Sequence, residues 1–266
     1  MKYKLFFYFP ILYFLHTRIA SMGKLVSWVI IYCVPTFYIL YNYSTLSFVN
    51  TVISYLLQIL LIYTFYEVGY IQNDCETIKN EVNPTLRLSS AELDYYEKHK
   101  VVIYLTRLGL GACLSAALWN LNNKDGALTF IFVATSILLV YQVYNKIRSR
   151  ITLVLHFVLV CLRFLSYPIL FVGSSMFFDF KYFSLFLIFP IVNLMERGSN
   201  KKFKVKFLQH LIPDPKDLNS FRMWYYFSAS LLLGILVYLQ LTQLWVLYLS
   251  LYFLFYRFMI VKVKMK

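Results

Sequence analysis

The chain has 266 residues, of which 60% are hydrophobic and only 14% are charged, and its mean hydropathy is +0.63. So few polar side chains cannot cover a soluble globule of this size, which excludes an ordinary soluble protein. The net charge of +14 raises nucleic acid as a partner. However, the lysines and arginines fall between apolar runs, as in a membrane protein, and nucleic-acid binding is not expected.

The first element is an apolar run over residues 3–15. It is too short to cross a bilayer, and His16, Thr17 and Arg18 close it in place of the small-residue cleavage site of a signal peptide. We therefore expect a retained interfacial or re-entrant helix.

Longer apolar runs recur along the rest of the chain. They predict an all-α, polytopic membrane protein with about 8 transmembrane helices, or about 9 with the N-terminal segment, in a single domain over residues 1–266. The expected spans are residues 25–43, 46–66, 101–119, 127–144, 151–172, 182–195, 223–239 and 244–260.

Two connecting segments are long, residues 67–100 and 196–222, and both are rich in lysine and arginine. The positive-inside rule places them in the cytoplasm together with both termini, with the chain in the plasma membrane (the inner membrane of a bacterium). Connections on the opposite side are short turns. We therefore expect any chemistry on a polar molecule to occur on the cytoplasmic side.

The first long segment concentrates acids in an otherwise apolar chain, in the stretch GYIQNDCETIKNEVNPTLRL. Because no helix breaker precedes Pro84, we expect the helix of the second span to continue to about Val82. Asp74 and Glu81 would then lie on one face, about 10 Å apart. Such a pair can hold Mg²⁺ around a diphosphate, with Asn73 as a neutral ligand or donor.

Magnesium is the expected cofactor because the ligands are hard oxygens and no His or Cys cluster is present in the sequence. Arg87 is placed to grip a phosphate oxygen, and Ser89 with Glu92 predicts a capping box that starts the next helix. The alternative is an acidic helix end that simply meets water.

Two arginines lie inside expected spans. Arg163 is about 20 Å from the cytoplasmic end of its span, so it should face a cavity or a partner, although snorkelling toward the far interface is the alternative. Arg107 is close to a span end and is expected to snorkel to the interface.

The sequence NDCETIKNE, residues 73–81, resembles the first aspartate-rich signature of the UbiA prenyltransferase superfamily, NDxxDxxxD. Asn73 and Asp74 match its first two positions, and Glu81 replaces the last aspartate. Thr77 replaces the middle aspartate, where the neighbouring Glu76 can substitute.

The resemblance continues downstream. Tyr144, followed by Lys146 and Arg148, resembles the tyrosine and basic pair of the family, and LVCLRFLS around Arg163 resembles a further family segment. Where the family carries a second aspartate motif, this chain has NLMERGSNKK. The basic segment around Arg197 is more similar to the branch that transfers phosphoribose to a polyprenyl phosphate.

The resemblance implies a UbiA-like helical bundle around a central cavity and an Mg²⁺-dependent transferase with a diphosphate leaving group. The substrate would be an isoprenoid lipid, either a prenyl diphosphate or a polyprenyl phosphate. The alternative within the family is phosphoribosyl transfer from phosphoribosyl diphosphate to polyprenyl phosphate for cell-envelope glycan synthesis. The implied residues are Asp74 and Glu81 for catalysis; Asp74, Glu81 and Glu76 for the metal; and Asn73, Arg87, Tyr144, Lys146, Arg163 and Arg197 for phosphate or substrate.

Two other classes remain open. A transporter would predict acids or broken helices near the bilayer midplane, and the expected spans contain no acid and no convincing break. A scaffold or assembly protein would leave the acidic stretch without a role.

Overall fold

A computed structural model describes residues 4–19, 21–81, 84–121, 124–147, 149–213 and 218–264. Within these ranges the chain is helical and has no strand, which confirms the all-α class. Several helices are long and apolar enough to cross a membrane, as expected for a multi-pass membrane protein. In the described ranges these 6 candidate spans are Met22–Tyr43, Phe48–Asn80, Ser90–Leu121, Lys124–Lys146, Leu218–Tyr238 and Leu244–Lys262.

Two of the expected spans are not continuous helices. The expected span 151–172 is interrupted between α7 (Thr152–Leu165) and α8 (Ile169–Val172), where Pro168 lacks a backbone donor. This broken pair would count as a seventh span. The expected span 182–195 is divided into α9 (Phe180–Phe183), a 3₁₀ turn and α10 (Pro190–Gly198), since Pro190 can begin a helix but not continue one.

The chain forms two compact units. Unit 1 comprises residues 1–148 and 166–173, and unit 2 comprises residues 149–165 and 174–266. The expectation of a single domain stays a prediction.

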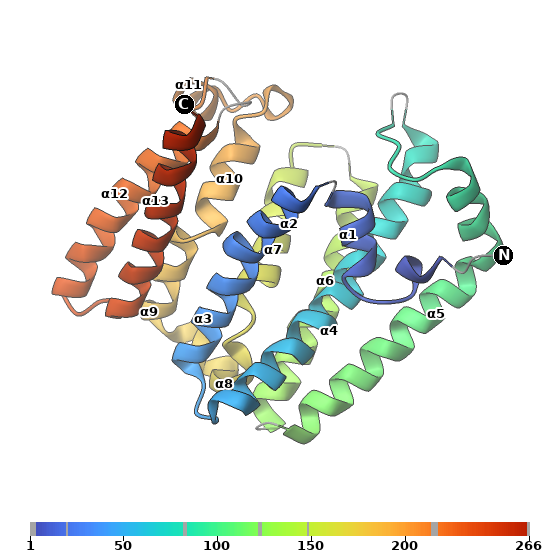
Figure 1. Cartoon of the computed structure of the whole chain (residues 1–266), viewed down its shortest axis with the longest axis horizontal. Coiled ribbons are helices and arrows are strands. Elements are labelled where there is room, and N and C mark those ends of the chain that lie inside the picture. Colours follow the sequence, from blue (N-terminus) through green and yellow to red (C-terminus); the bar gives the residue numbers. More distant parts are fainter. Residues whose placement is uncertain are drawn as a thin grey trace. The chain divides into compact units, whose positions relative to one another are not determined.

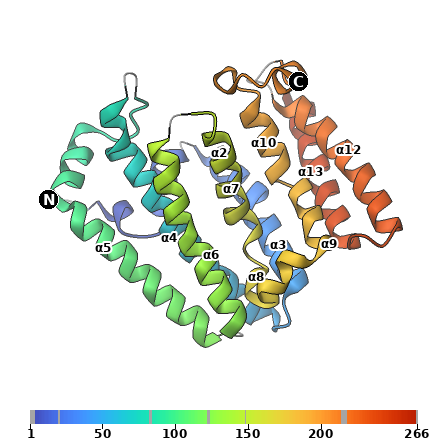
Figure 2. The ribbon, with the colours of Figure 1, turned by 180° about the vertical axis from the view of Figure 1, so that it is seen from behind.

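Three long helices of unit 1 lie side by side in both views of the ribbon (Figures 1 and 2). They are α4 (Phe48–Cys75), α5 (Ser90–Leu121) and α6 (Lys124–Lys146), and they follow α2 (Met22–Trp28) and α3 (Val34–Tyr43). Glycines permit close approach: a Cβ on Gly111 of α5 would lie 2.7 Å from the ring of Phe65 on α4, and Gly69 of α4 faces the ring of Tyr141 on α6.

The N-terminal segment folds back onto α4 and α5. It consists of a 3₁₀ turn (Leu5–Phe7) and α1 (Leu12–Arg18). The buried Glu67 of α4 accepts a hydrogen bond from the amide of Phe14 (2.7 Å) and pairs with Arg107 of α5 (2.7 Å). Arg107 also donates to the carbonyl of Phe7 (2.9 Å). These short helices agree with the helical segment expected over residues 3–15, but no single α-helix covers that range in the described residues.

The expectation that Arg107 snorkels is therefore wrong. The side chains of Glu67 and Arg107 are both 0% exposed. Arg107 does not snorkel, because a carboxylate and two backbone carbonyls satisfy its guanidinium inside the unit. The continuation of α4 past Glu67 agrees with the expected helix.

The end of α4 also differs from expectation. The α-helix ends at Cys75, a 3₁₀ turn covers Thr77–Asn80, and Glu81 is extended. The hydroxyl of Thr77 donates to the carbonyl of Gln72 (3.4 Å), and such side-chain bonds compete with regular helix geometry. Asp74 and Glu81 therefore do not share one helical face; the expected helix end at Val82 lies outside the described residues.

The start of α5 confirms one half of the predicted capping box, the bond from the Ser89 amide to the Glu92 side chain. The amide and hydroxyl of Ser89 donate to one carboxylate oxygen of Glu92 at 2.8 and 3.0 Å. The other oxygen of Glu92 lies 3.0 Å from Nε2 of His16. The cap thus also fixes the N-terminal segment.

Unit 2 is built on a helical hairpin of α12 (Leu218–Tyr238) and α13 (Leu244–Lys264), drawn in orange and red in Figure 1. Tyr226 stacks on Phe253 at 5.0 Å between the two helices. The carboxylate of Glu196 on α10 binds the guanidinium of Arg222 on α12. One turn earlier on α10, Asn193 contacts His156 of α7 at 2.8 Å.

Candidate functional site

A polar cluster surrounds Asp74 near the end of α4. The Asp74 side chain is 0% exposed, and its carboxylate accepts two hydrogen bonds from Arg18 (2.8 and 3.1 Å) and one from Arg87 (3.0 Å). The hydroxyl of Tyr13 donates at 3.1 Å and the amide of Asn73 at 3.2 Å. Two guanidinium groups around one carboxylate leave the cluster with net positive charge.

Three segments meet in this cluster. Asn73 and Asp74 come from α4, Arg87 comes from the chain before α5, and Tyr13 and Arg18 come from α1. Asn73 and Arg87 both bind Asp74, which agrees with the prediction that these three residues share one site.

Tyr13 and Arg18 are cluster residues that sequence reasoning missed. Arg18 ends an apolar run and was interpreted as part of its polar boundary, and its contact with Asp74 spans 56 residues of sequence. An arginine on a segment too short to cross the bilayer was the available signal. Its guanidinium also lies 4.3 Å from the centre of the Tyr70 ring.

Both α1 side chains keep their protons. Burial raises the pKa of Tyr13, and the negative charge of Asp74 raises it further. For Arg18, burial lowers the pKa, but the hydrogen bonds and charge of Asp74 outweigh that effect and raise it. Tyr13 is therefore a hydrogen-bond donor and Arg18 a cation at physiological pH.

The other two predicted metal ligands lie apart from Asp74 in different surroundings. Glu76 accepts hydrogen bonds from Tyr96 and Lys100 of α5, each at 2.5 Å. Glu81 follows the 3₁₀ turn and is half-buried. Among the described residues, no three His, Cys, Asp or Glu side chains are grouped so that they could hold a metal ion.

The donor set decides how well Mg²⁺ fits. A carboxylate offers about four lone-pair sites, and the carboxylate of Asp74 already accepts five N–H or O–H contacts. A directly bound ion would have to displace at least one of these donors. The described arrangement does not fit Mg²⁺ on Asp74, and magnesium stays a prediction from the resemblance.

Tyr144 and Lys146 lie in the last turns of α6. Between them, Asn145 donates to the carbonyl of Gly69 (3.1 Å) and to the side-chain oxygen of Gln72 (3.2 Å), which fixes this end of α6 against α4. Lys146 is exposed. Arg148 lies outside the described residues.

The remaining two predicted residues belong to unit 2. Arg163 is half-buried on α7. Arg197 lines a pocket of about 390 Å³ together with polar and basic side chains from α7, α10 and the turn after it. The lining residues are His156, Asn193, Glu196, Arg197, Asn200, Lys202 and Phe203. The predicted site residues thus belong to both units.

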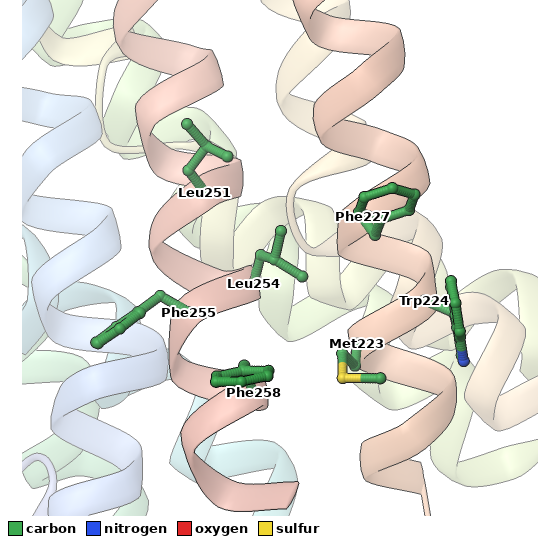
Figure 3. A pocket seen from close by; sticks show the side chains of 7 residues that line it. All are labelled: Met223, Trp224, Phe227, Leu251, Leu254, Phe255 and Phe258. Carbon is green, nitrogen blue, oxygen red and sulfur yellow. The ribbon is translucent and has the colours of Figure 1, made fainter. Parts of the chain in front are cut away.

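Unit 2 also carries an apolar groove of about 620 Å³ between α12 and α13 (Figure 3). Met223 and Phe227 of α12 face Leu254 and Phe258 of α13 across it. The lining contains hydrocarbon, aromatic and thioether side chains, which suit a hydrocarbon chain and offer little to a polar group.

Comparison of this chain with protein-family models, curated proteins and solved structures found no match. The resemblance to the UbiA superfamily therefore remains a hypothesis carried by the residues themselves.

Proposed function

We propose that this protein is a UbiA-type transferase of the plasma membrane that moves a prenyl group from a prenyl diphosphate to an acceptor. The observation that carries the proposal is the cluster at the end of α4, where Asn73, Asp74 and Arg87 meet Arg18. In this proposal the helices form a UbiA-like bundle, and the cluster and both termini face the cytoplasm.

The cluster offers chemistry suited to a diphosphate. The Arg18 and Arg87 side chains are 17% and 32% exposed, whereas the carboxylate that holds them is buried. Their free N–H groups can bind phosphate oxygens, with Asp74 fixing their orientation. When the bond between the prenyl carbon and the diphosphate oxygen breaks, the diphosphate leaves with the electron pair, and both arginines stabilise that charge. The acceptor then bonds to the carbon and loses a proton.

The pocket around Arg197 favours a second possible donor substrate, phosphoribosyl diphosphate. Its lining includes Arg197 and Lys202, and basic side chains suit the phosphates of phosphoribosyl diphosphate. In this version the acceptor is a polyprenyl phosphate.

A transporter is the candidate from another class. Two features favour it: the break between α7 and α8, and the buried ion pair of Glu67 and Arg107. Transporters use broken helices and buried charges of this kind, and neither feature is expected from the sequence. This candidate predicts movement of a solute without formation of a new covalent bond.

The test is a transfer assay on purified full-length protein. One tube holds radiolabelled prenyl diphosphate with aromatic acceptors, and the other holds radiolabelled phosphoribosyl diphosphate with polyprenyl phosphate, each with and without Mg²⁺. Asp74→Asn is the test variant, and Asp94→Asn, at an exposed position of α5, is the matched control.

We expect labelled product in the first tube, with a rate at least about 100-fold lower for Asp74→Asn because the arginines lose their anchor. Asp94→Asn should retain wild-type rate. Product only in the second tube would assign phosphoribosyl transfer. The absence of product in both tubes would contradict a transferase of either kind and favour the transporter.

A further inference from the structure

A groove on unit 1, here named the lateral groove, lies on a different side of α4 from Asp74. It has a volume of about 410 Å³. Residue 72 of α4 and residue 76, which directly follows α4 with helical backbone angles, project roughly opposite to residue 74, since each residue turns a helix by about 100°. The lateral groove is lined by Val68, Gln72, Glu76, Lys100, Tyr104, Leu108, Leu138 and Gln142.

The lining changes from polar to apolar along the groove. Each helix contributes residues one turn apart, and the rows on α4 and α5 each cover two turns, about 12 Å. The polar end of the groove is formed by Glu76, Lys100 and Gln142. The apolar end is formed by Val68 and Leu108. This gradient matches a molecule with a polar head and a hydrocarbon body.

The polar end offers hydrogen-bond donors. The carboxylate of Glu76 is the acidic group at this end, and it already accepts hydrogen bonds from Tyr96 and Lys100. The oxygen of Gln72 is used by Asn145, so its N–H groups remain for a ligand. Lys100 has two further N–H groups, and the amide of Gln142 is exposed. Such an end suits a head rich in acceptor oxygens, as a phosphate is.

The apolar end is open to hydrocarbon. Leu108 is 49% exposed and Leu105, one turn earlier on α5, is 62% exposed. Both lie within the candidate span Ser90–Leu121. A ligand that reaches this part of the groove therefore comes from the membrane.

We propose that the lateral groove binds a phosphate-bearing lipid, with the phosphate at Lys100, Gln72 and Gln142 and the chain along Leu108 and Leu138. This inference does not rest on the proposed transferase activity. Two sources share the chemistry, a membrane phospholipid and a polyprenyl phosphate.

The test is lipid binding to delipidated full-length protein in detergent, measured by native mass spectrometry. Four lipids are titrated: phosphatidylglycerol, polyprenyl phosphate, and their counterparts without phosphate, diacylglycerol and polyprenol. Leu108→Trp fills the groove, and Leu105→Trp places the same bulk on the same helix outside it. Lys100→Gln and Gln142→Leu remove donors from the polar end.

We expect at least one phosphate-bearing lipid to bind, about tenfold more tightly than its counterpart without phosphate. Leu108→Trp and Lys100→Gln should each weaken it about tenfold, and Leu105→Trp should change it less than about twofold. Which lipid binds identifies the source. Equal binding of the lipids without phosphate, or binding that survives both Leu108→Trp and Gln142→Leu, would overturn the proposal. Because no turnover is measured, this result is separate from that of the transfer assay.

Discussion

Glu67 and Arg107 form an ion pair that joins three parts of unit 1. Glu67 belongs to α4 and Arg107 to α5, and both also bind the backbone of the N-terminal segment. Each charge is completely buried, so each depends on the other for compensation. Asp74 plays the same part for Arg18 and Arg87, although those arginines remain partly exposed.

Removal of one partner of the buried pair should be more harmful than removal of both. Glu67→Gln leaves Arg107 charged and unpaired, and should destabilise the protein by about 3 kcal/mol or more. The double variant Glu67→Leu with Arg107→Met removes both charges and should recover part of that loss. The measurement is the midpoint of thermal unfolding in detergent.

Limited proteolysis gives a second readout of the same variants. Because Arg107 pairs with Glu67 and also holds the carbonyls of Phe6 and Phe7, Glu67→Gln should loosen the N-terminal segment and expose it to cleavage at Arg18. An unchanged unfolding midpoint together with an uncleaved segment would show that the pair is dispensable.

At the scale of elements, the position of Gly111 determines how closely α5 can approach α4. The chain has a second glycine two residues earlier, and a Cβ on Gly109 would meet nothing within 4 Å. Both glycines lie on α5, but only Gly111 packs against α4.

Gly111→Ala should therefore destabilise unit 1 by about 1–3 kcal/mol, because the new methyl group overlaps the ring of Phe65. Gly109→Ala is the matched control and should be neutral or slightly stabilising, since alanine favours a helix. Thermal unfolding of the two variants tests the contact. Equal midpoints would mean that α4 and α5 can separate without cost.

Hydropathy predicts some elements better than others. The runs that became α4, α5, α6, α12 and α13 are uninterrupted, and the sequence indicates them all. Hydropathy alone does not predict the helix breaks near Pro168 and Pro190, because the apolar run continues through each proline. Nor does it predict the end of α4, since the hydroxyl bond of Thr77 is a local competitor that periodicity does not show.

At the scale of the whole molecule, the asymmetric distribution of lysine and arginine predicts sidedness. The segments 67–100 and 196–222 carry many basic residues, whereas the turns on the other side carry few. By the positive-inside rule, this asymmetry predicts that both long segments face the cytoplasm.

Single-cysteine labelling tests this topology, starting from a variant in which the four native cysteines, all free thiols, are replaced by serine. A cysteine at Lys201 should react with a membrane-impermeant maleimide only after the membrane is opened. A cysteine at Lys124 should react in intact cells. The reverse pattern would invert the topology and place the Asp74 cluster outside the cell.

The candidate site was predictable only in part. Asn73, Asp74 and Arg87 lie within 15 consecutive residues, so a local motif was enough to associate them. The partners Tyr13 and Arg18 required knowledge of how the N-terminal segment folds back, a contact over 61 and 56 residues. No local pattern encodes a pairing of that length.

The fold-back of the N-terminal segment has a consequence for biosynthesis. Phe14 binds Glu67, which is synthesised 53 residues later, and Phe7 binds Arg107, which follows 100 residues after it. During translation, Glu67 is synthesised 40 residues before the arginine that neutralises it. The N-terminal segment cannot form its contact with Arg107 until α5 has been synthesised, so it is among the last parts of unit 1 to reach its final position. A nascent chain that stalls before Arg107 would carry an uncompensated acid, which quality-control proteases could recognise.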